Sequence, residues 1–114
     1  MTQDALAAAC SGQILVPAPA DAEIAAGYAS DMLSDVMANA PDAAALITIQ
    51  NHVNTIAVCT LANIRVVVVC HGRPIPEDMR KAAAAEGVGI ISTDLSQFEA
   101  SCAIGKALEG GACA

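Results

Sequence analysis

Three short polar segments hold most of the side chains that could bind a ligand in this chain. They are Gln50-Asn51-His52, His71-Gly72-Arg73 and Ser92-Thr93-Asp94, and each follows an apolar run rich in β-branched residues. A fourth polar segment, Tyr28-Ala29-Ser30-Asp31, comes earlier in the chain. If the apolar runs are parallel strands, these segments share one edge of the sheet, where open α/β sheets bind their ligands.

The chemistry of these segments suits a small anion such as a phosphate group or a nucleotide. Arg73 offers a planar guanidinium with two parallel donors, imidazoles titrate near neutral pH, and Gly72 lets a ligand approach the backbone. Helix N-termini that follow the strands would add free N–H groups. We therefore expect a ligand site made of eight residues: Asn51, His52, Asn54, His71, Gly72, Arg73, Ser92 and Thr93.

A purely structural interpretation of the same segments stays open. In that interpretation Asn51 caps a helix, His71 and Gly72 turn the chain, and Arg73 pairs with a carboxylate.

A metal site is a weaker alternative. It would require Cys59, Cys70, His52 and His71 to converge, and zinc or iron accepts such ligands. Cys70 and His71 are adjacent at a strand end, so their side chains point to opposite sides, and no ligand pair has a chelating spacing. We expect neither a metal nor another cofactor.

The motifs of common enzyme classes are absent from the sequence. Gly105-Lys106 lacks the upstream glycine and the following Ser or Thr of a P-loop, and Gly87-Val88-Gly89 precedes a strand instead of following one. There is no G-x-S-x-G nucleophile elbow. The sequence therefore favours a binding domain over an enzyme.

Composition limits the class of protein. With 114 residues the chain is long enough for one domain, and we expect a single domain over residues 1–114 with an ordered core at about 4–108. The formal charge is −7, only five residues are basic, and only Tyr28 and Phe98 are aromatic. Nucleic acid and anionic membrane surfaces are therefore not expected as partners.

The sequence also predicts the cellular location of the protein and the state of its cysteines. The amino-terminal segment carries an acidic residue where a secretory signal needs basic ones, and no apolar run approaches the ~20 residues of a spanning helix. We expect a cytoplasmic protein. The five cysteines are widely spaced without a C-x-x-C pair, which predicts reduced, mostly buried thiols.

The pattern of apolar residues alternates strands with helices. Strands are expected at Gln13–Val16, Glu23–Ala26, Ala44–Ile49, Ile64–Cys70 and Val88–Ile91. Helices are expected over Thr2–Cys10, Met32–Asn39 and Val53–Ala62, from Pro76 to Gly87, and from Ser92, Thr93 or Asp94 onward. Continuous apolar strands with helices between them predict an α/β fold, a three-layer sandwich with a mostly parallel sheet.

Several local details are also predicted. Gly12 is expected to end the first helix, Gly27 and Tyr28 to form a turn, and Ser30 or Asp31 to cap the second helix. Apolar residues of two helices are expected to face the core: Leu33, Val36, Met37 and Ala40 in the second, and Leu95, Phe98 and Cys102 in the last. Gly110-Gly111 should let the end of the chain fray.

The segment from Val53 to Ala62 is apolar on nearly every face of its helix. Because such a helix needs covering on every face, we expect part of it to lie in a homo-oligomer interface, most simply that of a dimer. The alternative is that the first helix and the tail of the same chain cover it.

Four segments of the chain resemble the DRTGG domain family, in particular its stand-alone members encoded near iron-only hydrogenase genes. The segments are GYASDMLSDVMANAP, ITIQNHVNTIAVCTL, VVVVCHGRPIPEDM and GVGIISTDLSQFEA, and the resemblance runs from about Asp4 to Leu108. LSDVMANAP and IQNHVN are its most specific parts. Where many members have Gly-Asp-Arg, this chain has Gln50-Asn51-His52, and where they have Gly-Gly it has His71-Gly72.

The resemblance implies a fold like the N-terminal domains of HPr kinase and Mur ligases. Because DRTGG domains accompany CBS modules in other proteins, it also implies a regulatory, ligand-binding role. The serine-kinase label used for some relatives does not carry over, since the kinase P-loop domain is not in this chain. We therefore expect a non-catalytic regulatory or accessory domain, or alternatively an interaction module for a redox or hydrogenase-related protein.

Overall fold

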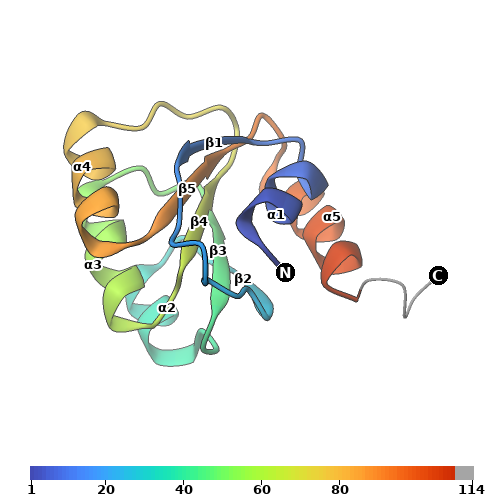
Figure 1. Cartoon of the computed structure of the whole chain (residues 1–114), viewed down its shortest axis with the longest axis horizontal. Helices are drawn as coiled ribbons and strands as arrows, with labels where there is room; N and C mark the ends of the chain where they lie inside the picture. Colours follow the sequence, from blue (N-terminus) through green and yellow to red (C-terminus); the bar gives the residue numbers. More distant parts are fainter. Residues whose placement is uncertain (110–114) are drawn as a thin grey trace.

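The computed structural model describes residues 1–109, which contain five helices and five strands (Figure 1). In chain order these are α1 (Gln3–Ala9), β1 (Gln13–Val16), β2 (Ala26–Ala29), α2 (Leu33–Asn39), β3 (Ala44–Thr48), α3 (Val53–Leu61), β4 (Val66–Val69), α4 (Glu77–Glu86), β5 (Gly89–Ser92) and α5 (Gln97–Glu109). The expected fraying at Gly110-Gly111 lies outside the described residues.

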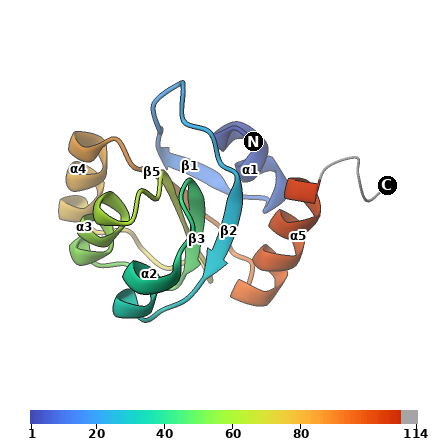
Figure 2. The same ribbon diagram turned by 90° about the horizontal axis from the view of Figure 1, so that it is seen from below.

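One mixed sheet forms the middle layer, with strand order β1-β5-β4-β3-β2. The pairs β2–β3, β3–β4 and β4–β5 are parallel, and β1 adds to β5 in the antiparallel direction. Helices α2, α3 and α4 cover one face, and α1 and α5 cover the other (Figure 2). This arrangement confirms the predicted α/β sandwich with a mostly parallel sheet.

The two central strands explain why both faces are covered. Every residue of β3 and β4 is buried. Because successive side chains of a strand point to opposite faces, Val67 and Val69 pack under α3 and α4, whereas Val66 and Val68 pack under α1 and α5. The run of valines therefore supplies both halves of the core.

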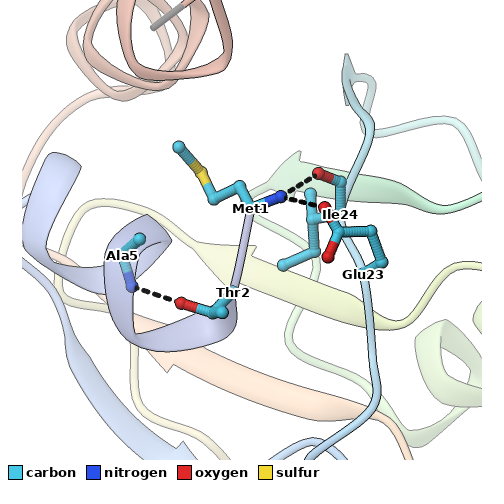
Figure 3. A network of polar contacts seen from close by, with 5 residues as sticks. All are labelled: Met1, Thr2, Ala5, Glu23 and Ile24. Atoms are coloured by element: carbon cyan, nitrogen blue, oxygen red, sulfur yellow. Dashed lines mark hydrogen bonds and ion pairs between the residues drawn. The ribbon is translucent and has the colours of Figure 1, made fainter.

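Strand β2 lies three residues later than predicted. Ala26 to Ala29 pair in parallel register with Ala44 to Ile47, so Gly27 and Tyr28 belong to the strand and form no turn. The predicted segment Glu23–Ala26 mostly precedes the strand. Its residues Glu23 and Ile24 instead meet the start of the chain, where the Met1 amino group binds the Glu23 carboxylate and donates to the Ile24 carbonyl (Figure 3).

Two predicted helix ends are wrong in detail. After α1, Ser11 takes the left-handed conformation (φ 53°), and Gly12 serves packing, because a Cβ there would lie 2.5 Å from Cγ2 of Ile91. Helix α2 has Met32 at its N-cap and receives no side-chain hydrogen bond there. Ser30 stabilises the turn before the helix, where its hydroxyl accepts from the Met32 N–H (3.2 Å).

The last helix begins at Gln97, later than predicted, because Ser96 and Glu99 form a reciprocal cap. The Ser96 hydroxyl accepts from the Glu99 N–H (3.1 Å), and the Glu99 carboxylate accepts from the Ser96 N–H (2.9 Å). Ala100 and Ile104 consequently face the core.

The residues predicted to face the core are therefore only partly correct. In α5, Phe98 is 78% exposed and Cys102 is exposed, so the prediction is wrong for both. In α2, Val36 is buried as predicted, whereas Met37 is exposed. The bounds of α4 agree with the prediction to within one residue, since Pro76 is the N-cap instead of the first helical residue and Gly87 closes the helix at a left-handed φ of 70°.

The thiols and the apolar helix α3 complete the core. Cys10, Cys59 and Cys70 are buried free thiols, as predicted, and Cys102 is an exposed one.

Helix α3 packs between α2 and α4 against the sheet, so its own chain covers most of it. Its outer face keeps Leu61 73% exposed. None of the helices within residues 1–109 is long and apolar enough to span a bilayer.

Candidate functional site

The four polar segments lie at or just beyond the carboxyl ends of the four parallel strands. Backbone hydrogen bonds extend the ladder into these segments: Ser30 donates to Ile47, Cys70 to Thr48, and Thr93 to Val69. In an open α/β sheet this edge is where ligands bind.

Asp31 organises this edge, a role that the sequence did not reveal. Its Oδ1 accepts hydrogen bonds from the Thr48 hydroxyl (2.8 Å), the Ile49 N–H (2.9 Å) and the Gln97 side chain (3.0 Å). Its carbonyl oxygen accepts from the side-chain amide of Gln50 (2.7 Å). Asp31 therefore ties the end of β2 to the end of β3 and to the start of α5, and does not cap α2.

The loop after β3 contributes Asn51 and His52. The Asn51 side-chain amide donates to the carbonyl of Pro74 (2.8 Å), which holds the β3–α3 loop beside the β4–α4 loop. His52, and not Asn51, caps α3, because its Nδ1 accepts from the Asn54 N–H (3.1 Å). With Nδ1 as the acceptor, the neutral ring carries its proton at Nε2, where a ligand oxygen can bind.

The loop after β4 contributes His71, Gly72 and Arg73, all of which are exposed. His71 (φ 62°) and Gly72 (φ 59°) form a left-handed turn, and their N–H groups donate to the carbonyls of Leu95 and Thr93 (2.9 Å each). Across residues 1–109 the Arg73 guanidinium makes no ion pair. The alternative in which Arg73 pairs with a carboxylate is therefore not seen.

The loop after β5 serves mainly to hold the fold. The buried Thr93 hydroxyl donates to the Cys10 carbonyl (2.7 Å) and accepts from the Leu95 N–H (3.2 Å). Ser92 is half-buried at the end of β5 and pairs with Gln13. Thr93 therefore positions the neighbouring loop through its backbone, since its carbonyl accepts from Gly72.

Acidic groups also lie at this edge, on the side of β5. A Cβ on Gly72 would lie 2.7 Å from Oδ1 of Asp94, so that carboxylate touches the His71-Gly72 turn. Hydrogen bonds from Ser96 and, more weakly, the charge of His71 hold the pKa of Glu99 below its usual range. The region around Asn51, His52 and Arg73 is the more favourable one for an anion.

The first turn of α3 contains a further polar group that the sequence did not single out. The hydroxyl of Thr55 is buried and, within the described residues, has no hydrogen-bond partner. It lies three residues after the His52 cap and one after the exposed Asn54. The sequence alone does not indicate that this hydroxyl is buried without a partner, because Thr55 lies among apolar residues that face the core.

The groups considered for a metal do not converge. In the described residues no three His, Cys, Asp or Glu side chains form a cluster suited to a metal ion. Burial raises the pKa of the Cys59 thiol to about 12 and, with smaller effects of the nearby Cys10 and Asp31 charges, that of Cys70 to about 11. Both thiols are therefore protonated at neutral pH.

No family model matches the sequence, and no curated protein matches it either. Among solved structures, the chain is similar to the CBS and DRTGG domains of the regulatory region of Clostridium perfringens pyrophosphatase, complexed with its activator diadenosine tetraphosphate. The TM-score is 0.69 at 13% sequence identity, over 90% of this chain and 45% of that chain. At this identity the likeness shows a shared fold, and this chain spans less than half of that structure.

Proposed function

We propose that this chain is a single DRTGG-like domain, cytoplasmic and non-catalytic, that binds a small anionic ligand such as a nucleotide in a regulatory or accessory role. The ligand site is the carboxyl edge of the sheet. Its residues are Asn51, His52, Asn54, His71, Gly72, Arg73, Ser92 and Thr93, of which the last two support the loops. The solved regulatory region of similar fold, complexed with a nucleotide activator, supports a regulatory role.

The hydrogen bond between Asn51 and Pro74 is the observation that carries this proposal. It holds together two loops that each present an exposed group able to bind an anion, His52 in one and Arg73 in the other. In a chain with a formal charge of −7, a guanidinium without a carboxylate partner in the described residues is suited to an external anion. The start of α3 adds the positive end of a helix dipole.

The test is ligand-induced thermal stabilisation. We expect ATP, ADP or diadenosine tetraphosphate at millimolar concentration to raise the melting temperature of the wild-type chain, and Arg73→Ala to abolish the rise. Arg65→Ala is the matched control, because it removes the same charge from the residue preceding β4, at the opposite edge of the sheet. If no nucleotide and no inorganic phosphate shifts the wild-type transition, or if both variants respond alike, the proposed site is wrong.

An interaction module is the second function that a specific observation favours. A groove of about 450 Å³ lies between α3 and α4 and is lined mainly by apolar side chains, among them the exposed Leu61. It suits an apolar helix of a redox or hydrogenase-related protein. In that case Leu61→Glu would abolish binding of such a protein in a calorimetric titration, whereas Arg73→Ala would leave binding unchanged.

A further inference from the structure

The outer face of α5 exposes the phenyl ring of Phe98, which the other described residues do not cover. Phe98, Cys102 and Gly105 recur at i, i+4 and i+7 and are all exposed, while Ala100 and Ile104 hold the opposite side of the helix against the sheet. Figure 2 shows α5 at the rim of the molecule, beside the edge strand β2, with no other labelled element outside it. Phe98 is the only phenylalanine of the chain.

Gly105 leaves an open space on the same face. A Cβ at this position would meet nothing within 4 Å, and its φ is not left-handed, so the fold of the chain itself does not require glycine there. A glycine inside a helix costs about 1 kcal/mol relative to alanine. Gly105 lies seven residues after the exposed Phe98 ring on the same face. Because glycine leaves this part of the surface flat, the phenylalanine ring of a second α5 helix can pack on it.

We propose that a second copy of this chain packs antiparallel along α5, with the two-fold axis between Ser101 and Cys102. Phe98 and Gly105 lie at equal distances before and after this point. In an antiparallel pair, residues at equal distances on either side of the axis face each other. The Phe98 ring of each copy therefore rests on the partner's Gly105, and the same contact forms twice.

The charges on α5 favour this direction of packing. Glu99 lies three residues before Cys102 and Lys106 four residues after it, and both are exposed. Antiparallel packing brings Glu99 to within two residue positions of the partner's Lys106, about 3 Å along the helix axis, at two symmetric places. The long lysine side chain spans this offset, whereas parallel packing would bring like charges together. The chain has a formal charge of −7, so a face carrying one of its five basic residues is well suited to self-association.

The size of the contact sets the strength of the dimer. The 13 residues of α5 span about 20 Å at 1.5 Å per residue. An interface centred on one such helix pair is at the small end of the range for specific complexes. We therefore expect dissociation in the micromolar range, independently of any ligand at the strand ends.

Sedimentation equilibrium tests the surface. We expect Phe98→Glu to weaken the dimer at least tenfold, and Leu61→Glu, the same kind of change on the similarly exposed outer face of α3, to leave it unchanged. A chain that stays monomeric at several hundred micromolar overturns the proposal. Dissociation by Leu61→Glu with none by Phe98→Glu also overturns it and places the interface on α3. Neither outcome bears on nucleotide stabilisation, which Arg73→Ala reports separately.

A charge exchange tests the antiparallel register. Lys106→Glu should weaken the dimer about threefold or more, and adding Glu99→Lys should restore it, since the two ion pairs re-form with reversed signs. Glu99 also caps α5 through its carboxylate, so thermal melting of Glu99→Lys alone checks that the fold tolerates the loss of this acceptor, with Glu99→Gln, which retains an oxygen acceptor, as the reference. If the double variant is no tighter than Lys106→Glu alone, the register is wrong.

Crosslinking locates the axis. In a Cys113→Ser background, a short bis-maleimide should join Cys102 to the partner's Cys102, because the other described thiols are buried. A covalent dimer that persists in Cys102→Ser would contradict an axis at this position.

Discussion

The hydroxyl of Thr48, buried at the end of β3, donates a 2.8 Å hydrogen bond to Oδ1 of Asp31, which lies beyond the end of β2. The same oxygen accepts from the Ile49 N–H and from Gln97 at the start of α5. One carboxylate thus joins the edge strand β2, the central strand β3 and the helix that covers them. The edge where we place the ligand site depends on this junction for its shape.

Asp31→Ala should destabilise the fold by about 2–4 kcal/mol, because it removes the acceptor of three hydrogen bonds and leaves the proton of the buried Thr48 hydroxyl without an acceptor. Urea unfolding followed by circular dichroism measures the change. Asp21→Ala, at an exposed position, is the matched control and should change the unfolding free energy by no more than about 0.5 kcal/mol. In a Thr48→Val background the cost of Asp31→Ala should be smaller, and equal costs in both backgrounds would mean that the two groups are not coupled.

Gly72→Ala should cost about 1 kcal/mol of stability, because Gly72 has a left-handed φ of 59°. The added Cβ would also lie 2.7 Å from Oδ1 of Asp94, but this atom ends a mobile, exposed side chain that can move away. Asp94→Ala should therefore recover little of the loss in urea unfolding. A full recovery would show that the clash, and not the backbone conformation, requires glycine.

Gly105→Ala is a control for Gly72→Ala, because the same substitution should here raise the stability of the fold instead of lowering it. Its Cβ would enter open space on a helix, so the stability of the monomer should rise by up to about 1 kcal/mol. A loss of stability on this change would contradict the geometry of α5.

The central sheet could be predicted because its strands are defined by their own residues. The apolar runs at Ala44–Thr48 and Val66–Val69 are buried on both faces, and such runs have few alternatives in a chain of this length. Strand β2 could not be placed in the same way. Ala26 to Ala29 include no β-branched residue, and it is the pairing with β3 that makes them a strand.

The inward face of α5 was predicted incorrectly because two apolar faces compete in its sequence. Leu95, Phe98 and Cys102 have helical spacing, but so do Ala100 and Ile104, and the Ser96–Glu99 cap starts the helix in the register that buries the second pair. Short-range spacing alone does not separate the two, because both satisfy the helical period.

The general place of the candidate site followed from topology, whereas its internal contacts did not. Parallel strands bring their carboxyl ends together, which was enough to group His52 with Arg73. The roles of Asp31 and Asn51 depend on partners 17 to 66 residues away, which local sequence cannot identify.

Ser96→Ala should lower the unfolding free energy by about 1 kcal/mol, since it removes the side-chain half of the cap on α5. Ser101→Ala, within the same helix, removes a hydroxyl that caps nothing and should be neutral or slightly stabilising. Thermal unfolding of both variants gives the comparison. Equal effects would show that the cap contributes no more than an ordinary serine in the helix.

Alkaline pH should destabilise the fold through Cys59. Burial raises the pKa of this thiol from 9.0 to about 12, so the folded state holds the proton more tightly than the unfolded chain does. The resulting stabilisation is fully present below pH 9 and is lost progressively as the pH rises toward about 12, because the unfolded thiol ionises first. Cys59→Ala should therefore lower stability at pH 7 by leaving a small cavity, yet flatten the fall of unfolding free energy measured in urea between about pH 9 and 11. Cys102→Ser, which alters an exposed thiol, should keep the wild-type slope, and a Cys59→Ala slope as steep as wild type would mean that other groups govern the alkaline transition.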